Sequence, residues 1–98
     1  MSPTFEARDA VYRAYRRLPA RQRDAFDRAR DRLVEDLRQS PPSYHPSLRL
    51  KRHQASGPGV YELSFGDGGR ALLRFGYELR EGVPHVEWLA IGGHEIVD

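Results

Sequence analysis

The second half of this 98-residue chain carries histidines and arginines suited to phosphate chemistry. His94 follows Gly92 and Gly93 at the end of an apolar segment, and Arg70 follows the glycine-rich segment 66–69. Cleavage of an RNA phosphodiester by its own 2′-hydroxyl needs cations around the phosphorane and groups that transfer protons. Histidine suits proton transfer near neutral pH, and arginine suits the phosphate charge. His94 and Arg70 are therefore the candidate catalytic residues for such a reaction.

A basic segment at 48–53 and the segment after Arg70 offer further cations for holding RNA. The candidate RNA-binding residues are Arg49, Lys51, Arg52, His53 and Arg74. Fifteen of the sixteen basic residues are arginine, which suits bidentate phosphate binding. A GC-rich coding sequence explains the same bias, since arginine also dominates the N-terminal segment, where no ligand is expected.

The four histidines do not show the spacing of a metal site. His45, His53, His85 and His94 have no i, i+4 pair and no HExxH pattern among them. We therefore expect no metal ligands and no cofactor. His53 and His85 are expected to be exposed ends of strands.

Composition limits the class of protein. A chain of 98 residues is expected to form one domain spanning 1–98, and the lack of cysteine excludes disulfides and thiolate metal sites. The first twenty residues are polar, and no apolar run approaches the length of a membrane span. We expect a soluble cytoplasmic protein without membrane partners. The net charge is +2, but residues 76–98 carry five acids and one arginine, so positive charge is concentrated upstream.

Helices are expected in the first forty residues. Ser2 and Pro3 are typical of a helix start, and apolar residues then recur at helical spacing through residues 3–17. Pro19 begins a second helix with an apolar stripe of Phe26, Ala29, Leu33 and Leu37. The pattern predicts an antiparallel helical hairpin over residues 1–40.

Strands are expected from residue 45 onward, where the apolar period changes to two. The segments 48–53, 60–65, 70–77 and 85–92 are the candidate strands of an antiparallel sheet over 45–98, which makes the fold α+β. A symmetric turn at 66–69 would place Arg70 opposite Phe65, on the face of Tyr61 and Leu63. A bulge at Gly68 and Gly69 would place it on the other face. The sequence leaves both arrangements open.

Four segments in order resemble the RelE/ParE toxin superfamily: 45–52, 59–64, 69–72 and 91–95. The resemblance implies a bacterial type II toxin that a small antitoxin protein neutralises. It also implies, for RelE-like members, metal- and cofactor-free cleavage of mRNA on the ribosome, which inhibits translation. Under that resemblance His94 matches the catalytic histidine, Arg70 the arginine that contacts the scissile phosphate, and Lys51 with its neighbours the RNA-holding segment.

Three departures from the family pattern support a second interpretation. The chain shows a helix where the family has a first strand, so we expect three or four strands with that strand missing. Glu62 and Ser64 stand where RelE has lysines, and Val97 stands where nucleases of the family have an aromatic residue. An acid at position 62 weakens phosphate affinity but can accept a proton. The alternative is a non-nuclease binding module, either gyrase-directed or degenerate, that an antitoxin still neutralises. A small α+β protein that binds a partner helix is a third possibility.

Overall fold

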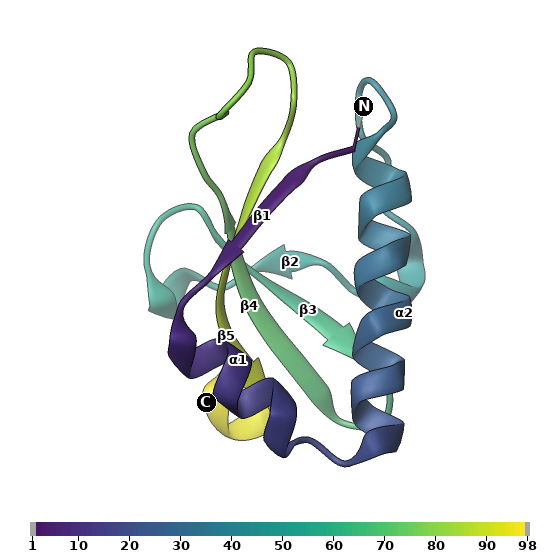
Figure 1. Cartoon of the computed structure of the whole chain (residues 1–98), viewed down its shortest axis with the longest axis vertical. Coiled ribbons are helices and arrows are strands. Elements are labelled where there is room, and N and C mark those ends of the chain that lie inside the picture. The colour runs from purple at the N-terminus through teal and green to yellow at the C-terminus, as the bar shows by residue number, and fades with distance from the viewer. Residues whose placement is uncertain (1, 98) are drawn as a thin grey trace.

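A computed structural model describes residues 2–97 and has an α+β fold with two helices and a five-stranded mixed sheet (Figure 1). The helices and strands are β1 (Thr4–Ala7), α1 (Asp9–Arg17), α2 (Ala20–Leu37), β2 (Lys51–Arg52), β3 (Val60–Phe65), β4 (Gly69–Phe75) and β5 (His85–Gly92). Short 3₁₀ turns lie at Pro46–Leu48, Gln54–Ser56 and His94–Ile96. The predicted bounds of the strands at 60–65 and 85–92 are confirmed, whereas the basic segment 48–53 contains a strand of two residues.

The expectation of a purely antiparallel sheet of three or four strands is wrong. The strand order is β1-β5-β4-β3-β2, and β1 runs parallel to β5 while the other neighbours are antiparallel. The expectation that no strand precedes the first helix is also wrong, because β1 occupies that place. Figure 1 shows that the chain passes through β1 before it enters α1, and β1 forms the edge of the sheet beside β5.

The prediction of a helix start at Ser2 and Pro3 is wrong, because the strand β1 follows directly at Thr4. Phe5 stacks on Trp88 of β5 with ring centroids 6.3 Å apart, and this contact favours an extended backbone there. The chain stays extended through Arg8, and α1 begins at Asp9. Tertiary packing on β5 therefore overrides the local helix signal at residues 3–8.

The two helices cover one face of the sheet. The predicted stripe of α2 is confirmed, since Phe26, Leu33 and Leu37 are buried. Phe26 meets Phe65 and Trp88 edge to face, with ring centroids 5.4 and 5.1 Å away. Burial of each large apolar side chain contributes about 1.5–3 kcal/mol. The helix α1 packs against β5, and α2 packs against β3. Among residues 2–97, no helix combines the length and the apolar character needed to cross a membrane.

The other sheet face is turned away from the helices, and we call it the open face. Side chains alternate along β3, so Leu63 and Phe65 join the helix-covered core while Glu62 and Ser64 lie on the open face. Val60, Leu72 and Val83 are also buried but lie outside that core cluster. Each of the two sheet faces therefore has its own buried side chains.

The β3–β4 turn decides which face Arg70 occupies. Phe65 pairs with Gly69, which leaves a three-residue loop of Gly66, Asp67 and Gly68, and Arg70 pairs with Ser64. Gly66 has a φ of 51°, and a Cβ there would lie 2.8 Å from Ala25 on α2, so glycine is needed at this turn. The pairing places Arg70 on the open face with Ser64 and Glu62, away from Tyr61 and Leu63.

Candidate functional site

Arg70 and His94 meet on the open face. Arg70 lies on the central strand β4, paired with Ser64 on β3 and Gly92 on β5. His94 begins the C-terminal 3₁₀ turn, and its Nε2 lies 3.2 Å from Nη2 of Arg70. A guanidinium only donates hydrogen bonds, so this contact requires an unprotonated Nε2 on His94. The two residues selected for chemistry therefore form one site, with a proton acceptor beside a fixed cation.

The two glycines before His94 make room for Glu95. The Gly93 N–H donates to Oε1 of Glu95 at 2.9 Å. A Cβ on Gly92 would lie 2.8 Å from Oε1 of Glu95, and one on Gly93 would lie 2.7 Å from Oε2. The Gly93 hydrogen bond lowers the pKa of the Glu95 carboxyl from its usual 4.5. The glycines thus let a carboxylate fold back against the backbone beside His94.

Glu62 carries the negative charge of this site. Its side chain is 8% exposed, and its Oε2 lies 3.4 Å from Nε of Arg70 and 3.8 Å from Nζ of Lys51. The Arg70 Nε is buried and makes no hydrogen bond within residues 2–97. Lys51 is largely exposed. One buried carboxylate therefore faces two cations, and Arg70 retains a buried donor that no protein acceptor uses.

Arg49 approaches the same site from another segment. It has a φ of 45° at the end of the 3₁₀ turn Pro46–Leu48. The preceding His45 N–H donates to the buried Asp36 at 2.9 Å, which ties this turn to the end of α2. Arg49 and Arg70 line a pocket of about 470 Å³, together with Ser47, Ser64 and the β3–β4 turn. This pocket has the size and charge to hold a phosphate group.

Three predicted RNA-binding residues lie elsewhere or have other contacts. His53 Nε2 lies 2.9 Å from the carbonyl oxygen of Val97, and its Nδ1 lies 2.6 Å from Oγ of Ser56. Arg52 is exposed and pairs with Tyr61, which directs it toward the helix-side face. Arg74 donates to Oε2 of Glu87 at 3.1 Å through Nε. Arg74 lies four positions after Arg70 along β4, a distance of roughly 13 Å.

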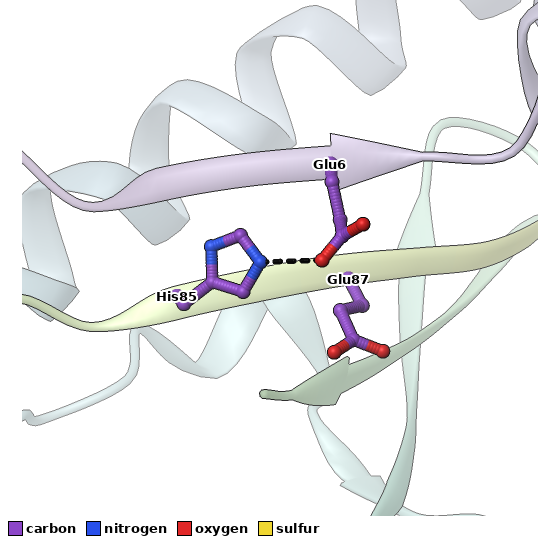
Figure 2. A group of neighbouring side chains, drawn as sticks. All are labelled: Glu6, His85 and Glu87. Carbon is purple, nitrogen blue, oxygen red and sulfur yellow. Dashed lines mark hydrogen bonds and ion pairs between the residues drawn. The ribbon is translucent and has the colours of Figure 1, made fainter. Parts of the chain in front are cut away.

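A second cluster on the open face was missed by the sequence analysis. Figure 2 shows His85 and Glu87 of β5 beside Glu6 of β1, with an interaction between His85 and Glu6. Nε2 of His85 lies 2.7 Å from Oε1 of Glu6. The expectation that His85 is an exposed strand end is wrong, since it is 3% exposed. Glu6 lies 79 residues from His85, so local spacing carries no signal for this cluster. One donor atom from each of the three residues lies within 4.8 Å of the others.

The chain was compared with protein-family models, curated proteins and solved structures, and none of these matches it.

Proposed function

We propose that this chain is a RelE-like ribosome-dependent mRNA endonuclease, the toxin of a type II toxin–antitoxin system, and that it inhibits translation. The contact of 3.2 Å between Arg70 and His94 carries the proposal, because it joins a phosphate-binding cation to a proton-transfer group on an open surface. The ordered sequence resemblance to the RelE/ParE superfamily supplies the substrate class. The reaction needs no cofactor.

The chemistry is an in-line attack of the RNA 2′-oxygen on the adjacent phosphorus. The bond from phosphorus to the 5′-oxygen breaks, which leaves a 2′,3′-cyclic phosphate and a 5′-hydroxyl. Arg70 stabilises the phosphorane charge with its guanidinium, whose buried Nε faces Glu62. Glu62 is the general base that takes the proton of the 2′-hydroxyl, and His94, in its imidazolium form, is the general acid that protonates the leaving 5′-oxygen.

RNA binding follows from the cations around this centre. Arg49 lines the pocket beside Arg70, and Lys51 lies 3.8 Å from Glu62, the ion-pair partner of Arg70. Arg52, beside Lys51 on β2, extends the positive charge to a neighbouring surface. Glu62 offsets part of this charge, which agrees with a nuclease that receives its message from the ribosome and does not bind free RNA tightly.

The test is cell-free translation followed by primer extension on the ribosome-bound message. The wild-type chain is expected to produce discrete cuts, and His94→Ala and Arg70→Ala are expected to abolish them. Arg80→Ala, which removes an exposed arginine beyond the opposite end of β4 from Arg70, is the matched control and should cut normally. Circular dichroism verifies that each variant is folded. The absence of wild-type cuts would refute nuclease activity.

One observation favours the alternative of a non-nuclease binding module. Glu62 lies within ion-pair distance of both Arg70 and Lys51, so two of the site's cations already have an anionic partner. A gyrase-directed or degenerate toxin does not need an arginine that is available to bind the RNA phosphate. It predicts growth arrest without message cuts, or no arrest, and induction of a DNA-damage response distinguishes the gyrase-directed form.

An antitoxin is the proposed partner in both cases. A segment that folds on binding buries apolar side chains, and the chain offers an apolar pocket of about 290 Å³ lined by Phe5, Tyr12 and Trp88 among others. Co-expression with the protein of the adjacent reading frame should relieve growth arrest and yield a stable complex. A short, acidic neighbouring gene is the expected source of that partner.

A further inference from the structure

The cluster of Glu6, His85 and Glu87 lies on the open face but apart from Arg70 and His94 (Figure 2). We propose that these three side chains bind a divalent ion of the zinc class, with water in the remaining position. The proposal is independent of the nuclease function, because none of the three residues contacts the Arg70–His94 pair.

His85 is oriented as a metal ligand would be. It is 3% exposed, and its Nδ1 lies 2.8 Å from Oγ1 of Thr4. When the Nδ1–H donates to Thr4, the lone pair of Nε2 faces the Glu6 carboxylate. This is the outer-shell arrangement that fixes the tautomer of metal-binding histidines. In the metal-free protein a proton lies between Nε2 and Glu6, and the metal replaces that proton, which is released to solvent.

Glu87 presents one carboxylate oxygen to the same place. Arg74 holds its Oε2, whereas Oε1 accepts no hydrogen bond within residues 2–97. A Cβ on Gly76 would lie 2.3 Å from that Oε1 and 3.1 Å from Cδ2 of His85. The glycine therefore leaves a space beside the imidazole, and the unused oxygen of Glu87 occupies it.

Charge also favours a cation here. Glu6 and Glu87 are direct partners in the parallel β1–β5 register, and like charges at such a position repel. The Glu6 side chain is 62% exposed and free to adjust its rotamer. Zinc lies about 2 Å from each donor atom, so the donors of a tetrahedral site lie roughly 3.3 Å from one another. The three donor atoms already lie within 4.8 Å of one another, and the exposed Glu6 side chain can adjust to the ion.

The ligand set determines the class of ion. One imidazole nitrogen and two carboxylate oxygens match zinc and similar transition metals better than calcium, which prefers six or more oxygens. Glu6 and Glu87 also border a cavity of about 300 Å³, which has room for a bound water. The bound ion would join β1 to β5, the one parallel pair of the described sheet.

The experiment titrates Zn²⁺ into the tag-free, metal-stripped chain against a chromophoric chelator, and records the visible bands of Co²⁺ in parallel. The expected result is one bound Zn²⁺ per chain, with at least about tenfold weaker binding in Glu6→Gln and in Glu87→Gln. Asp24→Asn removes an exposed carboxylate from α2 and should bind as the wild type does. Zinc should raise the melting temperature of the wild type more than that of either glutamine variant.

Two results would overturn the proposal. One is the absence of saturable Zn²⁺ binding by the wild type. The other is unchanged affinity in both Glu6→Gln and Glu87→Gln, which would assign the bound zinc to other histidines of the chain. Since Glu6 is exposed, its glutamine variant tests the site without disturbing the core.

Discussion

Arg70 and Glu62 lie diagonally across β4 and β3, with Nε of Arg70 3.4 Å from Oε2 of Glu62 and both side chains largely buried. The distance is that of an ion pair, and the Arg70 Nε makes no hydrogen bond within residues 2–97. Glu62 thus holds the guanidinium in place by charge, through the buried Nε of Arg70. The carboxylate lowers the positive potential of the site and also supplies a proton acceptor within it.

Glu62→Gln separates these two effects. We expect RNA to bind a few-fold more tightly, because a negative charge is removed from beside Arg70 and Lys51. We expect the cleavage step to slow by about 10²-fold or more, because the amide cannot accept the proton. Single-turnover cleavage on ribosomes measures the rate, and a binding assay on RNA measures the affinity.

Asp67→Asn is the matched control for Glu62. Asp67 lies in the turn that borders the same pocket, but it makes no ion pair with Arg70 among the described residues. Removal of the Asp67 charge should strengthen RNA binding slightly and leave the rate of the cleavage step unchanged. Faster cleavage by Glu62→Gln would show that Glu62 only weakens RNA binding and does not transfer a proton.

His53→Ala tests whether His53 positions the C-terminal turn or binds RNA. The carbonyl of Val97 only accepts, so the 2.9 Å contact requires an N–H on Nε2 of His53. Loss of this hydrogen bond should make the His94–Ile96 turn more mobile, and so lower kcat by about 10- to 100-fold with little change in KM. His53→Gln, which can donate to the same carbonyl, should restore part of the rate. A rise in KM with kcat unchanged would instead assign His53 to RNA contact.

Local patterns predicted the strands β3 and β5 well because apolar and polar residues alternate along Val60–Phe65, and apolar residues dominate the later part of His85–Gly92. The strand β1 has four residues, and its partner begins at His85, so no local pattern predicts the pairing. Ser2 and Pro3 suggested a helix start because the sequence does not show that Phe5 stacks on Trp88.

The sequence predicted which residues belong to the candidate site, but not which side chains each of them contacts. His94 and Arg70 were selected for their chemistry, and their contact depends on a three-residue turn that the sequence left open. Arg74 was selected by charge alone, and its role depends on Glu87, which follows it by 13 residues. Buried polar groups satisfy one another over long sequence distances, so their partners follow from the register of the sheet.

Asp36→Ala should destabilise the fold by about 3 kcal/mol, because it removes a buried charge partner. Asp36 is fully buried and accepts from Arg32 at 2.9 Å and from the His45 N–H at 2.9 Å. Urea unfolding measures the change. Glu35→Ala, at the neighbouring exposed position, should stay within about 0.5 kcal/mol of the wild type. Equal effects of the two substitutions would show that the Asp36 contacts contribute little.

Tyr15→Phe should alter how stability depends on alkaline pH. The Tyr15 hydroxyl donates to Oδ1 of Asp27 at 2.8 Å, and this bond, with burial, raises the pKa of Tyr15 above its usual 10.0. The folded state then holds the proton more tightly than the unfolded state, so the contribution is complete below pH 10.0 and is lost as pH rises through the folded pKa. Burial also raises the pKa of Tyr44, and that effect is common to the wild type and the variant.

The Tyr15→Phe substitution should lower the free energy of unfolding by about 1 kcal/mol near neutral pH, and the difference from wild type should shrink at about pH 11. Urea unfolding at the two pH values measures it, with Tyr12→Phe removing an exposed hydroxyl of the same helix as the control. A difference that stays constant from neutral to alkaline pH would contradict the assigned role of the Tyr15–Asp27 hydrogen bond.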